Sequence, residues 1–383
     1  MKIKQKLPII AQIVPELDRG GVERGTIEMA EAIKRKGWKS IVISNGGNMV
    51  GHLKRLGVEH YDIQVNNKII FKWPIIKKQL KNIFLNEDIN IVHVRSRVPA
   101  WLALSIAKKL NIKTVSTIHS RFKPKNFLKY FYNKKMLNAD QIIAISQYIK
   151  DTILSDYKIR NIEKKLSVIY RGVDLNIFNN SSVSQYRIIQ EAERISLPYD
   201  KKIIMLPARA TSWKGHKILI DAVAKIRNRD FILVLLGASD GSKNFVDDLH
   251  NHCRQNSLEQ NVRIVSWSND MPASLMLADV VVMPSIVPEP FGRISVEAQS
   301  MGRPIVAFNH GGAKETILNN ATGWLAEEIN SISLSENIQK ALAMNEKERK
   351  AFAQRTRVHI KNNFSKEQMC NQTLEIYKNL ISA

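Results

Sequence analysis

Two glutamates, Glu289 and Glu297, stand eight positions apart around a stretch that could hold phosphate or sugar oxygens. Between them lie Phe291, Gly292 and Arg293, where a loop is expected to become a helix. Backbone N–H groups at the start of a helix lack partners within it and lie at the positive end of its dipole. An anionic or polar ligand can bind there, and Gly292 lets the chain approach it closely.

The elements that must position these glutamates are a strand, a loop, a helix and a second strand. An apolar run at 280–283 ends at Pro284, as a buried parallel strand does where it meets a loop. Residues 293–301 have helical spacing and are followed by Gly302-Arg303-Pro304, which ends the helix. A second apolar run at 305–308 predicts the next strand.

The complete ordered string is more specific than the two glutamates. It consists of Glu-Pro-Phe-Gly (289–292), Ser-Val-Glu-Ala (295–298), Gly-Arg-Pro (302–304), Gly311-Gly312 and Glu315. This string resembles the nucleotide-sugar signature of the retaining family-4 glycosyltransferases, which keep two glutamates with seven residues between them. The resemblance covers nearly the full chain and is weakest at 45–90 and 120–165.

The resemblance implies a GT-B fold of class α/β, with two Rossmann-like doubly wound domains that face a cleft. The C-terminal helix of this fold crosses back to the first domain. The resemblance places Glu289 beside the hydroxyls of the donor sugar and Glu297 beside the ribose. Pro290, Phe291, Gly292 and Arg293 are then expected to bind the same donor.

Arg209 and Lys214, five residues apart after an apolar strand at 202–206, could close on a diphosphate from two sides. They match the diphosphate pair of the resembling family. Sugar transfer makes negative charge grow on the departing diphosphate, so we expect catalysis by electrostatic stabilisation from both residues and the helix start at Gly292. The resemblance implies retention by same-face attack, with the leaving phosphate accepting the acceptor's proton. No Asp-x-Asp metal motif is present, so we expect no metal and no cofactor, only a nucleotide-diphosphate sugar as substrate.

In the first half, a strand at 8–14, the pair Gly20-Gly21 and a helix at 23–36 form a phosphate-binding arrangement in outline. Two adjacent glycines are more often a turn than a site. The resemblance places this loop against the donor diphosphate and the acceptor, which assigns Gly20 and Gly21 to the substrate site.

His119 directly follows an expected strand at 113–118, so it lies at the carboxyl end of that strand. Open α/β sheets bind their ligands at this edge. A single histidine there is more often structural than catalytic. In the resembling family, however, a histidine-containing step at this strand end faces the transferred sugar, so His119 is expected to contact that sugar.

Strands alternate with helices along both halves, which predicts a doubly wound parallel sheet in each. Further strands are expected at 40–44, 89–94, 141–145, 166–170, 231–236 and 262–265. We expect an acceptor-binding domain at 1–180, joined by the helix at 365–383, and a nucleotide-sugar domain at 186–364. The polar segment 179–185 is expected to link them.

The charge is strongly positive, with 58 Lys and Arg against 35 Asp and Glu, or +23. Residues 1–195 hold 35 of these cations and 16 of the acids, so the first half is the basic one. Such a surface suits phospholipid, lipopolysaccharide phosphate or nucleic acid. Compositional bias of the source would give the same numbers. Two cysteines, Cys253 and Cys370, are too few for a disulfide framework and indicate a reducing compartment.

Two basic segments of the first half also carry aromatic rings. Residues 121–135 hold six cations among five rings, and residues 69–78 are similar. This composition is typical of a segment at a membrane interface, but also of an amphipathic helix that packs its rings on a sheet. No apolar run approaches the ~20 residues that span a bilayer. We expect a cytoplasmic protein, peripheral on the inner face of the cytoplasmic membrane.

The expected acceptor is an anionic lipid or a lipid-linked saccharide, as in lipopolysaccharide-core or envelope-polysaccharide synthesis. Two other function classes compete with sugar transfer. A related fold could isomerise nucleotide sugars, although the basic and aromatic first half favours a large anionic acceptor. Nucleic-acid binding is suggested by charge alone, and no RNA- or DNA-binding motif is present.

Overall fold

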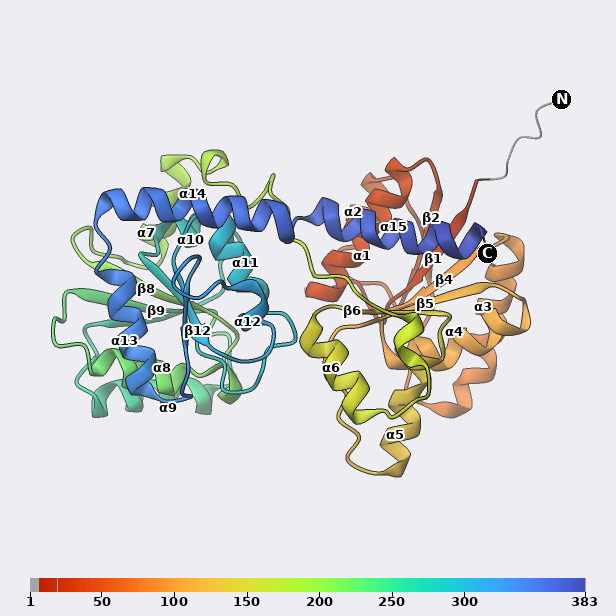
Figure 1. The fold of residues 1–383 in the computed structure, drawn as a ribbon, viewed down its shortest axis with the longest axis horizontal. Coiled ribbons are helices and arrows are strands. Elements are labelled where there is room, and N and C mark those ends of the chain that lie inside the picture. The colour runs from red at the N-terminus through yellow and green to blue at the C-terminus, as the bar shows by residue number, and fades with distance from the viewer. Residues whose placement is uncertain (1–6, 19, 383) are drawn as a thin grey trace. The chain divides into compact units, whose positions relative to one another are not determined.

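The computed structural model describes residues 7–18 and 20–382, which form two compact units (Figure 1). The first comprises residues 1–171 and 366–383, and the second comprises residues 172–365. The polar segment 179–185 therefore lies within the second unit. Val173 ties this part of the chain to the second unit, because its N–H donates to the carbonyl oxygen of Phe364 at 2.8 Å.

In the described part of the first unit, seven parallel strands form one sheet in the order β3-β2-β1-β4-β5-β6-β7. These strands are β1 (Ile9–Ile13), β2 (Lys39–Ser44), β3 (Glu59–Asp62), β4 (Ile91–Val94), β5 (Lys113–Ile118), β6 (Gln141–Ala144) and β7 (Leu166–Val168). The strand order reverses between β1 and β4, as in a doubly wound sheet. The carboxyl ends of the strands therefore offer a ligand site at that edge.

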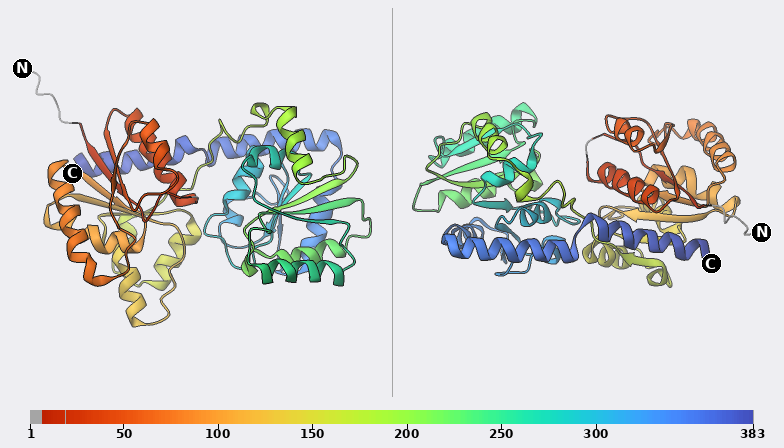
Figure 2. Two further views of the ribbon diagram at one scale, coloured as in Figure 1. Left: turned by 180° about the vertical axis from the view of Figure 1, so that it is seen from behind. Right: turned by 90° about the horizontal axis from the view of Figure 1, so that it is seen from above.

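Helices cover both faces of this sheet. They are α1 (Gly21–Arg35), α2 (Val50–Arg55), α3 (Trp73–Asn86), α4 (Arg97–Lys109), α5 (Phe127–Lys134), α6 (Gln147–Asp156) and α15 (Lys366–Ser382), with short 3-10 turns η1 (Ile70–Lys72), η2 (Lys135–Asn138) and η3 (Ile162–Lys165). The C-terminal helix α15 lies beside α1 (Figure 2). Its Met369, Leu374 and Tyr377 are buried in one core cluster with Ile10 of β1 and Met29 of α1. The expected return of the last helix to the first domain is thus confirmed.

The second unit, described in full, has a six-stranded parallel sheet in the order β10-β9-β8-β11-β12-β13. Its strands are β8 (Lys202–Pro207), β9 (Phe231–Leu236), β10 (Val262–Val265), β11 (Val280–Met283), β12 (Ile305–Phe308) and β13 (Trp324–Ala326). Its helices are α7 (Gln185–Arg194), α8 (His216–Ala224), α9 (Lys243–Gln255), α10 (Met271–Leu277), α11 (Arg293–Ser300), α12 (Ala313–Thr316), α13 (Ser331–Leu342) and α14 (Glu346–Asn363), with 3-10 turns η4 (Asn180–Ser182) and η5 (Ser212–Lys214).

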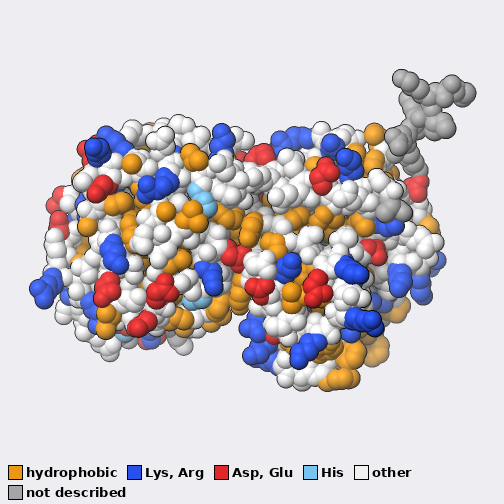
Figure 3. All heavy atoms as spheres, viewed as in Figure 1, with side chains coloured by type: hydrophobic (Ala, Val, Ile, Leu, Met, Phe, Trp, Pro, Cys, Tyr) orange, Lys and Arg blue, Asp and Glu red, His pale blue; other side chains and the backbone are white. Residues whose placement is uncertain are grey.

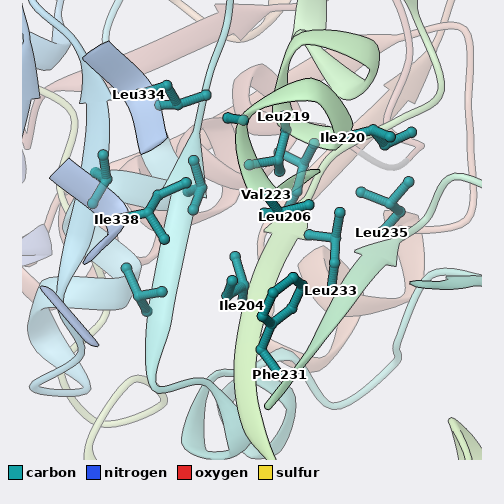
Figure 4. Close-up of a cluster of buried hydrophobic side chains, with 14 of the residues drawn as sticks. Ile204, Leu206, Leu219, Ile220, Val223, Phe231, Leu233, Leu235, Leu334 and Ile338 are labelled. Atoms are coloured by element: carbon teal, nitrogen blue, oxygen red, sulfur yellow. The ribbon is translucent and has the colours of Figure 1, made fainter. Parts of the chain in front are cut away.

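The core of the second unit forms where α8 and α13 pack on the sheet (Figure 4). Leu206 of β8, Phe231 of β9, Leu219 of α8 and Ile338 of α13 are all buried there. Burying a side chain of this size contributes about 1.5–3 kcal/mol, so this cluster anchors the strands whose ends carry the glutamate string.

The two doubly wound parallel sheets confirm the predicted α/β class and its Rossmann-like halves. The apolar runs located most strands to within two residues, because a strand buried on both faces reads as an uninterrupted apolar segment. Sequence reasoning missed β3 at the sheet edge, whose Glu-His-Tyr-Asp residues show no apolar pattern. It also missed β13, which is only three residues long.

Candidate active site

The loop between β11 and α11 carries the glutamate string, and its course depends on Gly292. This residue has φ +83°, and a Cβ atom there would lie 2.9 Å from Cε of Met283. A glycine is therefore needed where the chain turns from β11 into α11. Beside it, the buried ring of Phe291 packs edge to face on Phe364, with 5.9 Å between centroids. The first residue of the helix, Arg293, is thus held by a fixed turn.

Glu289 is buried, and one oxygen of its carboxylate accepts two hydrogen bonds. Its Oε1 atom accepts from Nζ of Lys214 at 2.5 Å and from Oγ of Ser285 at 2.6 Å. The same ammonium lies 4.2 Å from the ring centroid of Trp213, a cation–π contact. An ammonium has three donors, so Lys214 can keep Glu289 and still donate to a ligand. The structure thus brings two predicted site residues together.

Loops from three neighbouring strand ends meet at Glu289. The loop after β8 contains Gly215, where a Cβ atom would lie 1.8 Å from the carbonyl oxygen of Pro284 after β11. The loop after β12 contains Gly311 and Gly312, and the N–H of Gly312 donates to the Glu289 carbonyl at 2.8 Å. A Cβ atom at Gly311 would lie 2.6 Å from that same carbonyl oxygen. The close approach of these backbones explains why glycines recur in the string.

Glu297 is buried on α11, one turn after Arg293. Its Oε1 atom accepts a hydrogen bond from the Arg293 guanidinium at 3.0 Å, an ion pair between positions i and i+4. Pro290 is half-buried in the loop before this helix. Arg209 is exposed after β8 and forms no ion pair with any described residue, so its guanidinium can reach an anion. All these residues belong to the second unit.

Gly20, Gly21 and His119 belong to the first unit. The helix α1 begins at Gly21, and Gly20 has extended backbone with φ 172°. The carbonyl oxygen of Gly21 accepts a hydrogen bond from the guanidinium of Arg171 at 2.6 Å. The predicted glycine loop is therefore fixed by a side chain from the end of the same sheet.

His119 lies directly after β5, and its Nε2 atom is buried without a hydrogen-bond partner among the described residues. Burial, followed by the charges of Arg171 and Arg95, holds the pKa of His119 well below its usual value. The imidazole is therefore neutral at pH 7. A neutral imidazole can exchange hydrogen bonds with a sugar hydroxyl, and the sugar-contacting role of His119 stays a prediction.

Sequence reasoning missed three residues beside these sites. Arg95 follows β4 directly, and the rule that singled out His119 at a strand end would have found it. Arg171 lies three residues beyond the end of β7, so the strand-end rule alone does not single it out. His310 precedes the glycine pair after β12, where it stacks on Phe308 with centroids 6.2 Å apart. Burial lowers the pKa of His310, and the Glu289 carboxylate partly opposes that effect.

Comparison with known proteins agrees with this geometry. Residues 19–177 match the model of "Glycosyltransferase Family 4", and residues 188–359 match that of "Glycosyl transferases group 1". A crystal structure of a glycosyltransferase from Rickettsia africae is 34% identical in sequence, covers 98% of this chain and 99% of its own, and superposes with a TM-score of 0.91.

Two further relatives are more distant. Anabaena HepE in complex with UDP-glucose shares the fold, with a TM-score of 0.83 and 21% identity over 97% of this chain and 99% of that one. The lipopolysaccharide 1,2-N-acetylglucosaminetransferase of Salmonella typhimurium is 24% identical over 277 residues, which is 70% of this chain and 68% of that protein.

The fold is the GT-B fold of glycosyltransferases. The chain belongs to the glycosyltransferases that join a family 4 N-terminal domain to a group 1 C-terminal domain.

Proposed function

We propose that the protein is a retaining hexosyltransferase that moves a sugar from a nucleotide-sugar donor to a membrane-associated saccharide. The observation that carries this proposal is the pair formed by Glu289 and Lys214 where three loops of the second unit meet. A carboxylate and an ammonium held at one strand edge offer an acceptor for sugar hydroxyls and a donor for phosphate oxygens. Anabaena HepE, with the same fold, binds UDP-glucose, which supports a nucleotide sugar as donor.

In the proposed reaction, Glu289 accepts hydrogen bonds from hydroxyls of the donor sugar, and Glu297 accepts them from the ribose. Negative charge grows on the departing diphosphate as the anomeric bond breaks. Lys214, Arg209 and the backbone N–H groups at the start of α11 stabilise that charge without a metal. The leaving phosphate takes the proton of the attacking hydroxyl on the same face of the sugar, so the configuration is retained.

The acceptor proposal rests on the surface of the first unit. Apolar side chains that face solvent there include Phe71 beside α3, which is 92% exposed, and Phe127 and Leu128 of α5, which are 73% and 78% exposed. Lys123 and Lys125 precede α5, Lys129 lies within it, and all three are exposed. Hydrophobic and basic side chains gather at the end of the first unit where α5 lies (Figure 3).

An exposed apolar patch rimmed by lysines fits an anionic lipid surface, with the rings at headgroup level. Among residues 7–18 and 20–382, no helix has the length and apolar character needed to cross a bilayer. We propose, from the basic and apolar surface alone, that the enzyme binds peripherally to the inner face of the cytoplasmic membrane. The Salmonella relative acts on lipopolysaccharide, which supports lipopolysaccharide-core or envelope-polysaccharide synthesis as the pathway.

The test is a transfer assay with sugar-labelled UDP-, GDP- and ADP-hexoses and a lipid extract of bacterial envelope. We expect label from one donor to enter the lipid fraction, with the anomeric configuration of the donor kept by NMR. Glu289→Gln should abolish the transfer. Label that stays on the nucleotide as an isomer would replace the transferase proposal with an isomerase, and inverted product would exclude the retaining mechanism.

A further inference from the structure

A small, partly open cavity in the first unit lies at the carboxyl ends of β4 to β7, under α1 and α15. Its polar lining comes from His93, Arg95, Thr117, Arg171 and Thr373. Its volume suffices for about one or two water molecules. The cavity lies at the sheet edge where doubly wound folds bind ligands, so its chemistry bears on substrate binding.

Arg95 is a buried cation without an anionic partner. Its side chain is only 5% exposed, and Nε and NH2 both donate to Oε1 of Gln12, at 3.1 and 2.6 Å. Gln12 is neutral, and in the part of the chain that the structure describes Arg95 forms no ion pair. An isolated buried charge is costly, so a side chain of this kind calls for a compensating anion.

The buried carboxylate of Glu28 pairs with Arg171 and not with Arg95. Arg171 lies 3.9 Å from Oε2 of Glu28, both side chains being buried. Among the described residues, no carboxylate forms an ion pair with Arg95. His119, whose pKa is lowered by burial and then by both arginines, adds no charge.

Three further titratable groups lie beside Arg95, and none of them carries a negative charge. The ring of His93 is bonded to the hydroxyls of Tyr377 at 2.5 Å and Thr117 at 2.7 Å, and burial holds its pKa well below the usual value. Burial raises the pKa of the Tyr377 hydroxyl. Burial also raises the pKa of the Cys370 thiol to about 12. All three groups are neutral at pH 7 and do not offset the charge of Arg95.

A glycine in α1, Gly25, leaves room for the guanidinium of Arg171. Gly25 lies inside α1, where a Cβ atom would be 2.0 Å from NH2 of Arg171. Glycine within a helix is unfavourable relative to alanine. Its presence here leaves room for the guanidinium against the helix, and thereby fixes the charge at the wall of the cavity.

We propose that this cavity binds one small oxyanion, and that its occupant is a phosphate or carboxylate group carried by the sugar acceptor. The identity of the occupant rests on the proposed function, whereas oxyanion binding itself does not. One or two oxygens of the group enter the cavity and accept hydrogen bonds from Arg95, while the remainder of the acceptor stays outside. The site would select anionic acceptors and fix them beside His119.

The test is calorimetric titration of the full-length protein with inorganic phosphate, and separately with acetate. Saturating UDP is present to occupy any phosphate site of the second unit. We expect one phosphate to bind per chain, and Arg95→Gln to weaken that binding roughly tenfold or more. The matched control is Arg97→Gln, because Arg97 stands two positions on but is half-exposed and bonded to Asn133 at 3.1 Å.

Arg95→Lys keeps the charge without the planar fork and should retain part of the affinity, while near-UV circular dichroism checks that the Arg95→Gln variant folds. Absence of binding of both phosphate and acetate to the wild type, equal binding to Arg95→Gln, or binding only when UDP is left out would each overturn the proposal. Acetate binding without phosphate binding would restrict the site to carboxylates. Because donor transfer is not measured, a failed transferase assay leaves this result interpretable. In an active enzyme, Arg95→Gln should raise KM for an anionic acceptor and not for the donor.

Discussion

Lys214 and Glu289 stand 75 positions apart in the sequence, yet Nζ and Oε1 lie 2.5 Å from each other. The lysine side chain is 22% exposed and the glutamate side chain 10%. Removing either charge would leave its partner poorly solvated in a site built from three loops. The pair therefore couples the stability of the second unit to its proposed chemistry.

The coupling can be measured with Lys214→Met, Glu289→Gln and the double variant. We expect Lys214→Met to destabilise the second unit by roughly 1–3 kcal/mol, because it leaves a buried carboxylate with one hydrogen-bond donor fewer. The double variant should recover part of that loss. Urea unfolding followed by tryptophan fluorescence gives the interaction energy, and additivity within about 0.5 kcal/mol would contradict a coupled pair.

Glu297→Ala should weaken donor binding and spare the fold. A carboxylate that accepts hydrogen bonds from ribose hydroxyls contributes about 1.5–3 kcal/mol to binding. Titration calorimetry with UDP or the nucleotide of the active donor measures the loss. Glu346→Ala is the matched control, since Glu346 forms an exposed helix pair with Lys350 on α14. Equal donor affinity in both variants would remove Glu297 from the site.

The glutamate string could be predicted from the sequence because its parts are contiguous and its glycines have local causes. The residues that contact these glutamates could not be predicted from the sequence. Lys214 reaches Glu289 across two loops, and nothing in the sequence distinguishes that partner from other lysines. The expectation that Lys214 binds a diphosphate came from resemblance, and its ion pair with Glu289 is new information from the structure.

Arg95 and Arg171 could not be singled out from the sequence for a different reason. Each follows an apolar strand as a single basic residue in a very basic half, so neither stands out by composition. Their importance comes from burial, with Glu28 paired to Arg171, and burial depends on how α1 and α15 cover the sheet. That packing joins residues at opposite ends of the chain, which local patterns do not encode.

Gly25→Ala should lower the stability of the protein, although a change from glycine to alanine within a helix usually raises it. Alanine normally stabilises a helix relative to glycine by about 0.5–1 kcal/mol. At Gly25 the added methyl group would overlap the Arg171 guanidinium, so we expect a destabilisation of roughly 1–3 kcal/mol. Gly51 of α2 is the matched control, because a Cβ atom there meets no other atom within 4 Å. The unfolding temperatures of Gly25→Ala and Gly51→Ala test this expectation. A stabilised Gly25→Ala protein would show that Arg171 moves aside freely.

His216 makes the stability of the second unit depend on pH. Its ring is buried at the start of α8, edge-on to Phe245, and burial lowers its pKa to about 4. The unfolded chain binds a proton near pH 6.5 and the folded chain does not, so stability is full above that pH and falls as the pH drops toward 4. The loss amounts to about 3 kcal/mol over this window. Urea unfolding at pH 7.5 and 5 should show a smaller difference for His216→Gln than for the wild type. An unchanged difference would assign the acid sensitivity to other groups.

The basic and apolar surface of α5 predicts reversible binding to anionic vesicles. Each lysine near such a surface contributes about 1 kcal/mol, so a cluster of them can hold the protein without a spanning helix. The test variant replaces Lys123, Lys125, Lys129 and Lys134 with glutamine. The control variant makes the same change at four exposed lysines of the second unit, Lys314, Lys340, Lys347 and Lys361. Both variants lose four positive charges, so any difference between them reports the position of the lysines and not the net charge.

We expect the wild type and the control variant to sediment with anionic vesicles at low salt, and the test variant to stay in the supernatant. High salt should release the wild type, because screening shortens the reach of the charges. If the wild type does not sediment at low salt, or if the two variants behave alike, α5 is not the membrane-binding surface.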